Sequence, residues 1–223
     1  MVSNSGLAMH FPSVSPHALE PGDIAACYGV DWTGRLISCG TASLWGPPGL
    51  RWPPSHVAIC CRHDDGILWV ESTSLCRHAC LIRGCSAAGV QAHRPLNRIG
   101  DYVRAGGRVD VYRLSDINGL SATESRLLSR ILIDHCVRKH VQYDLSGAVL
   151  SGTRAFQLSH LFPGADLERL FCSELIAAVL MRLGRMNHAN PTRFNPGRLL
   201  RELVRTGKYR PVATFQRSRT CCE

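Results

Sequence analysis

Ser55-His56-Val57-Ala58-Ile59 and, much later in the chain, Phe171-Cys172-Ser173-Glu174-Leu175-Ile176 are the two stretches that decide the fold. The first predicts a β-strand that opens with a histidine. The second predicts a helix that starts at a cysteine. A thiol beside an imidazole is the minimal set of groups for covalent acyl-group chemistry. The histidine precedes the cysteine in the chain. This order restricts the folds that could bring the two groups together, as well as the chemistry.

The composition indicates a single globular domain. The chain has 223 residues, of which 45% are hydrophobic and 19% are charged, and this length is sufficient for one domain with a substantial core. We expect a flexible N-terminal tail over residues 1–20, one domain over 21–216 and a C-terminal tail over 217–223. No apolar run approaches the roughly 20 residues that a membrane-spanning helix requires, so no transmembrane segment is expected.

The cysteines and the N-terminus together predict a reducing compartment. The chain contains 11 cysteines, and its first 20 residues lack the basic start and apolar core of a secretory signal. An odd number of cysteines without such a signal favours reduced thiols and a cytoplasmic location. The formal net charge of +9 leaves open an anionic surface or polymer as a partner, although a solvated basic surface is the simpler interpretation. No basic run with interleaved aromatic residues predicts a specific nucleic-acid site.

The pattern of apolar residues predicts strands first and helices later. Asp64-Asp65-Gly66 supplies the turn of a hairpin, and Ser121 with Glu124 forms a capping box at a helix start. Residues 46–54 contain four prolines and two glycines, which predicts a loop at the border of a substrate cleft. Strands are expected over 24–28, 56–61, 67–71, 89–92, 109–113 and 209–215, and helices over 33–44, 121–139, 172–183 and from 195 to about 204. This order predicts an α+β fold in which one antiparallel sheet packs against helices.

Cys172 occupies a position in which a thiol becomes reactive. At helical spacing it shares an inward face with Leu175, Ile176 and Val179. It also lies in the first turn, where the helix dipole and the free amide groups favour a thiolate and can hold a developing oxyanion. The alternative is that Cys172 is a small buried apolar residue, as most free cysteines are.

Strand parity gives His56 a candidate partner. A two-residue Asp65-Gly66 loop pairs Cys60 with Glu71, whereas a four-residue loop pairs Ala58 with Glu71. Either register places Glu71 on the same face as His56, and the second makes the two residues diagonal neighbours. A carboxylate there orients the imidazole and stabilises its protonated form. A three-residue loop would instead place Glu71 on the opposite face from His56. The alternative for Glu71 is an exposed carboxylate at the end of a strand.

Six short segments carry a resemblance to a known family. In chain order they are Pro21-Gly22-Asp23-Ile24, Ser55-His56-Val57-Ala58-Ile59, Val70-Glu71, Gly89-Val90-Gln91, Tyr143-Asp144 and Phe171-Cys172-Ser173-Glu174-Leu175. Their order and spacing, over about residues 20–215, resemble the permuted papain-like, NlpC-related amidases of the YiiX type. The resemblance implies a circularly permuted papain-like (NlpC-like) fold, in which the histidine strand precedes the cysteine helix.

The resemblance also implies a triad and a reaction. Cys172 is then the nucleophile, His56 the general base and Glu71 the orienting member. Tyr143 and Ser173 are further candidates for contacts with the substrate or its oxyanion. The family implies a cysteine-dependent hydrolase, amidase-like or peptidase-like, that passes through a thioester acyl-enzyme. Peptide, amide and lipid-ester substrates all remain open.

Three alternatives accompany this interpretation. A thiol acyltransferase or lipid hydrolase of the same fold would use the same groups, and a catalytically idle domain would bind an anionic partner through its basic surface. A structural zinc site is the third, with ligands drawn from Cys60, Cys61, His63, Cys76, His78, Cys80 and Cys85. The spacing of these residues lacks the paired gaps of common zinc motifs, so neither a metal nor a cofactor is expected. Cys221-Cys222 suggests a modified tail but does not fit the prenylation pattern.

Overall fold

The structure is a computed structural model that describes residues 19–29, 50–64, 66–73, 76–141 and 171–217. Several predictions lie outside the described residues: most of the N-terminal tail, the helix over 33–44, Tyr143 with its neighbour Asp144, and Cys221-Cys222. Among the helices that are described, none combines the length and apolar character needed to cross a membrane.

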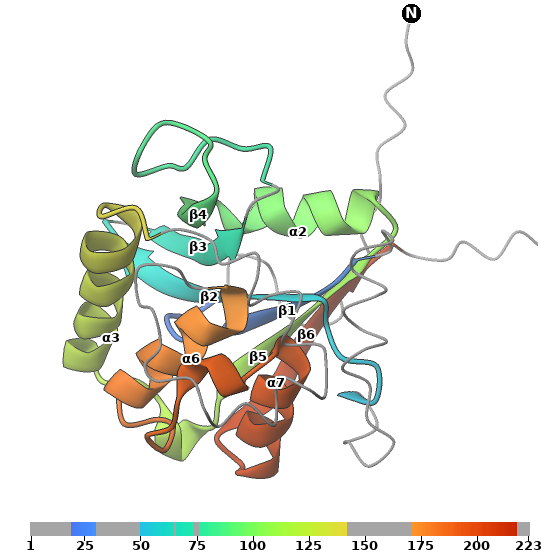
Figure 1. Cartoon of the computed structure of the whole chain (residues 1–223). Coiled ribbons are helices and arrows are strands. Elements are labelled where there is room, and N and C mark those ends of the chain that lie inside the picture. The colour runs from blue at the N-terminus through green and yellow to red at the C-terminus, as the bar shows by residue number, and fades with distance from the viewer. Residues whose placement is uncertain (1–18, 30–49, 65, 74–75, 142–170, 218–223) are drawn as a thin grey trace, which may run out of the picture.

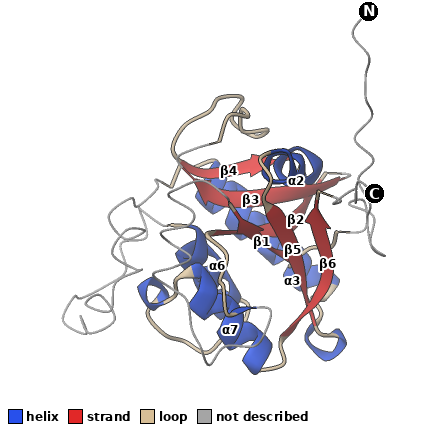
Figure 2. Cartoon of the chain, turned by 90° about the vertical axis from the view of Figure 1, so that its right-hand side faces the viewer, coloured by secondary structure: helices blue, strands red, loops and turns tan. Residues whose placement is uncertain are grey.

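A six-stranded antiparallel sheet forms the centre of the fold (Figures 1 and 2). Its spatial order is β4-β3-β2-β1-β5-β6. The strands are β1 Ile24–Tyr28, β2 His56–His63, β3 Gly66–Thr73, β4 Gly89–His93, β5 Arg108–Leu114 and β6 Tyr209–Gln216. Every strand expected from the sequence overlaps one of these, so the predicted α+β class with an antiparallel sheet is confirmed.

The hairpin between β2 and β3 fixes the register that the sequence left open. Ile59 pairs with Val70, and continuing that register places Glu71 opposite Ala58. This is the register that makes Glu71 a diagonal neighbour of His56. His63 and Gly66, the first and last residues of the four-residue loop, also pair with each other.

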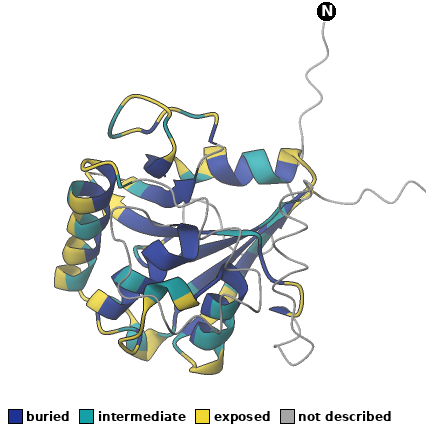
Figure 3. Ribbon diagram, viewed as in Figure 1, coloured by how far each residue is buried: buried dark blue, intermediate teal, exposed yellow. Residues whose placement is uncertain are grey.

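Helices cover both faces of the sheet and enclose two cores (Figure 1). Helix α2, Pro95–Arg104, packs on one face of the sheet. The other face is covered by α3 Ala122–Ser129, the π-helical segment Arg130–Val137, α6 Cys172–Arg182 and α7 Pro196–Arg205. Strand alternation divides the side chains of β2, with Val57 and Ile59 in the core against α6, and Ala58 and Cys60 in the core against α2. Figure 3 shows the strands buried between these two layers.

Local capping contacts define the helix ends, beginning with the predicted capping box of Ser121 and Glu124. The Ser121 hydroxyl accepts a hydrogen bond from the Glu124 N–H (3.2 Å), and the Glu124 carboxylate accepts one from the Ser121 N–H (2.8 Å). Asn195 caps α7 by accepting from the Arg198 N–H at 2.8 Å. Gly184 follows α6 with a φ of 66°, a left-handed conformation that favours glycine at the end of a helix.

A close contact joins α7 to the segment that leads into β2. Gly197, in the first turn of α7, packs so tightly on Pro53 that an added Cβ would lie 2.4 Å from the Pro53 Cβ. In addition, Arg201 donates through Nη1 to the Leu50 carbonyl oxygen at 3.4 Å. The position of the residues just before β2 therefore depends on α7.

Replacing Gly197 by alanine should destabilise the protein by about 1–3 kcal/mol, because overpacking against Pro53 outweighs the higher helix propensity of alanine. The control is Gly100→Ala in α2, where the new Cβ would meet only the flexible end of Arg104 at 3.2 Å. At that position the higher helix propensity of alanine should dominate, so the free energy of unfolding should stay equal to that of the wild type or rise by up to ~1 kcal/mol. Urea unfolding measures both changes. A Gly197 variant as stable as the Gly100 variant would contradict the contact.

Candidate active site

His56 and Glu71 lie together on the face of the sheet that α2 covers. His56 is the first residue of β2, and Glu71 lies near the end of β3. Nε2 of His56 is 2.7 Å from Oε2 of Glu71, and the imidazole donates this hydrogen bond. The His56 side chain is 14% exposed, whereas that of Glu71 is fully buried. The alternative of an exposed carboxylate at a strand end is therefore wrong.

Glu71 is also held by an arginine that the sequence did not single out. Arg98 on α2 donates through Nε to Oε1 of Glu71 at 2.5 Å and through Nη2 to Oε2 at 3.3 Å. Burial alone would raise the pKa of this carboxyl group, but Arg98 and then His56 hold the pKa well below its ordinary value. Glu71 is therefore a carboxylate at neutral pH despite its full burial.

Cys172 also contacts His56. It is the first residue of α6 and is 3% exposed, and its side chain interacts electrostatically with the imidazole. Burial by itself lowers the pKa of His56, but the interactions with Cys172 and then with Glu71 raise the pKa to about 10. The structure thus brings Cys172, His56 and Glu71 into one connected group, with the imidazole protonated at neutral pH.

The start of α6 places backbone amide groups next to this sulfur. The first N–H groups of a helix have no partner within the helix, so those of the first turn are the available donors for a substrate oxygen. Ser173 donates its hydroxyl to the Phe194 carbonyl oxygen at 2.6 Å and is fully buried. Its side chain therefore anchors α6 to the residues that precede α7. Tyr143, the other candidate, lies outside the described residues.

A second layer of polar groups surrounds Arg98. Asp101 accepts hydrogen bonds through Oδ2 from Nη1 of Arg98 (3.0 Å) and from Nε2 of His78 (2.8 Å). Sequence reasoning missed this layer because residues 94–104 were not assigned to a helix. The available signal was Pro95 at a helix start, followed by an arginine and an aspartate three residues apart.

A group of potential metal ligands adjoins Glu71. Donor atoms of Glu71, Cys76 and His93 lie within 4.8 Å of one another, all in buried residues, and no other such trio occurs in the described part of the chain. These donor types suit zinc. Arg98, however, already donates two hydrogen bonds to Glu71, so a divalent cation would be repelled by the guanidinium and would have to displace it. The group is better described as the surroundings of the Glu71–Arg98 ion pair.

The zinc site considered from the sequence is not assembled in the described residues. Of its seven candidate ligands, only Cys76 belongs to a group of donors. Cys60 and Cys61 lie in opposite cores, Cys80 lies in the core against α6, and Cys85 is exposed. Every cysteine that the structure describes is a free thiol.

Comparison with known proteins gives a weak structural likeness. No protein-family model and no curated protein matches the chain. Among solved structures, the chain is similar to metalloprotein yiiX from Escherichia coli O157:H7, with 16% identity, coverage of 89% of this chain and 88% of that chain, and a TM-score of 0.45. A likeness this weak assigns neither a family nor an activity to this chain.

His56 should titrate near pH 10 in the folded protein, well above the ordinary value of 6.5. Because the folded pKa is raised, the stabilisation from this proton is fully present below about pH 6.5 and is lost as the pH rises through about 10. In Cys172→Ala the pKa should fall well below 10, since the largest of the raising contributions is removed. NMR of the imidazole measures both values, with Cys85→Ser as a control at an exposed thiol. A wild-type His56 that titrates near 6.5 would contradict this description.

Proposed function

We propose that this protein is a cysteine-dependent hydrolase in which Cys172 is the nucleophile, His56 the proton carrier and Glu71 the group that orients His56. The observation that carries the proposal is the continuous contact from sulfur to imidazole to carboxylate. A protonated imidazole beside the sulfur favours the thiolate, which is the nucleophilic form. A buried carboxylate on the imidazole keeps the ring oriented and its charge compensated.

Acylation follows from this arrangement. The Cys172 thiolate attacks the carbonyl carbon of an amide or ester, and a carbon–sulfur bond forms while the carbonyl oxygen takes up the negative charge. Amide groups of the first turn of α6 stabilise that oxyanion. The tetrahedral species then collapses, the bond to the amine or alcohol breaks, and His56 gives its proton to the leaving group.

Deacylation regenerates the starting state. Neutral His56 takes a proton from water, the resulting hydroxide attacks the thioester carbonyl, and the carbon–sulfur bond breaks to release a carboxylic acid and the Cys172 thiolate. An alcohol or amine in place of water would make the same protein an acyltransferase. Hydrolysis is the form of the proposal that needs no second substrate.

We also propose the circularly permuted papain-like arrangement. Its support is the order of the elements, with His56 on an early strand, Glu71 on the next strand and Cys172 at the start of a later helix. The cysteine helix packs on the sheet that carries the other two residues. This matches the order that the resemblance implies.

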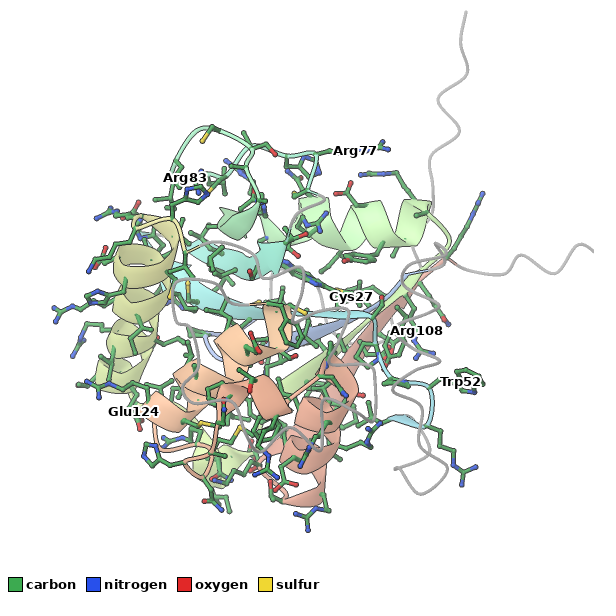
Figure 4. All side chains as sticks on the ribbon, viewed as in Figure 1. Cys27, Trp52, Arg77, Arg83, Arg108 and Glu124 are labelled. Carbon is green, nitrogen blue, oxygen red and sulfur yellow. The ribbon has the colours of Figure 1, made fainter. Side chains whose placement is uncertain are left out.

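The substrate would approach past the segment before β2. Trp52 is 66% exposed there, and Figure 4 shows it directed outward. Figure 4 places Arg77 and Arg83 on the loop between β3 and β4, and Arg108 on β5. An acyl group with an apolar portion, in a peptide, amide or lipid ester, is the substrate class that we propose.

The test uses p-nitrophenyl acetate, whose acyl transfer to a thiol releases a coloured phenolate. The wild-type protein should give a burst of product with acetate attached to Cys172, identified by peptide mass spectrometry. Cys172→Ala should lower the rate by roughly 10³-fold or more, because the nucleophile is removed. Cys85→Ser should retain the full rate. A Cys172→Ala protein that keeps the burst would refute the proposal.

A further inference from the structure

Arg98 is a buried cation directed at the active-site carboxylate. Arg98 is 7% exposed and lies on α2. Among the hydrogen bonds of the described residues, it is the one residue of α2 that bonds Glu71. Two of its N–H groups bond the two carboxylate oxygens of Glu71, and Nη1 bonds Asp101 at 3.0 Å. This fork geometry is one that an arginine provides and a lysine does not.

The reaction cycle creates a need for such a cation. Glu71 is fully buried, and a buried carboxylate stays ionised only while a positive charge or hydrogen-bond donors compensate it. His56 supplies positive charge only while it is protonated. After His56 gives its proton to the leaving group, a second cation must keep Glu71 ionised, or the carboxylate would take up a proton and lose its hold on the imidazole.

We propose that Arg98 is the positioning residue that keeps Glu71 ionised and oriented throughout the cycle. This inference rests on the proposed function, because it assigns a role relative to the Cys172–His56 pair. Arg98 acts through Glu71 and touches neither the substrate nor the sulfur.

Outer contacts keep Arg98 in place. Asp101 accepts hydrogen bonds from Arg98 and His78, and the Tyr102 ring lies 5.4 Å from the Arg98 guanidinium carbon. The titratable groups around the Glu71–Arg98 pair come from several elements: Cys27 on β1, His56 on β2, Cys76 before β4, His93 on β4, Asp101 and Tyr102 on α2. Arg98 is the permanent cation among these groups.

The experiment compares Arg98→Met, Arg98→Lys and the control Arg104→Met. Arg104 lies on the same helix and bonds Asp101 but is 62% exposed. NMR gives the pKa of His56, and the rate of Cys172 alkylation by iodoacetamide is followed from about pH 5 to 9. Arg98→Met should lower the pKa of His56 and reduce alkylation at about pH 6 by tenfold or more, because Glu71 becomes neutral. Arg98→Lys should recover part of the His56 pKa and part of the alkylation rate that Arg98→Met loses. Arg104→Met should match the wild type in both.

The double variant Glu71→Gln with Arg98→Met keeps the test decisive if Arg98→Met alone fails to fold. Removing both partners of a buried ion pair is better tolerated than removing one. If Arg98 acts through Glu71, then adding Arg98→Met to Glu71→Gln should change the proton-binding constant of His56 and the rate of Cys172 alkylation by less than about twofold each. The inference would be overturned if the double variant lost as much alkylation rate as the two single variants together. A His56 pKa in Arg98→Met equal to that of the wild type would also overturn it. A lower His56 pKa in Arg98→Met together with an esterase burst that survives Cys172→Ala would uphold Arg98 and refute only the hydrolase proposal.

Discussion

The ion pair between Glu71 and Arg98 is the interaction on which the candidate site depends. A carboxylate with no exposed surface is unfavourable unless it is fully compensated, and here one side chain from α2 compensates it with two hydrogen bonds. That compensation allows Glu71 to accept the hydrogen bond of His56, and the charged His56 in turn faces Cys172. The pair also joins α2 to β3, so the same contact that prepares the site fastens one layer of the fold to the sheet.

The three residues of the group come from three different kinds of position. A strand start supplies His56, strand alternation places Glu71 on the same face, and a helix start supplies Cys172 with its free amide groups. The sheet and α6 meet where these positions converge, although the cysteine and the histidine lie far apart in the sequence. The chemistry therefore depends on the packing of α6 against the sheet, which the apolar face of that helix provides.

Local patterns were sufficient to predict most of this arrangement. The alternation in β2 and β3, the capping box at Ser121 and the apolar face after Cys172 each predicted an element that the structure contains. The hairpin register stayed open, because turn composition alone does not decide which loop residues pair. Arg98 could not be predicted as a partner of Glu71, since a basic residue on an unassigned helix is usually solvated and its burial depends on how that helix packs. The alternative of a zinc site gains no support from β2, because strand alternation separates Cys60 from Cys61.

The most direct measurement of the central claim is selective alkylation at about pH 6, where an ordinary thiol is almost entirely protonated. Two thiols distinguish the effect of solvent access from that of activation by a neighbouring group. Cys85 is exposed, whereas Cys172 is buried beside a protonated imidazole. Limited iodoacetamide treatment followed by peptide mass spectrometry should find Cys172 modified first and Cys85 largely unmodified. Modification of Cys85 before Cys172 would mean that access alone governs reactivity, and it would contradict an activated Cys172.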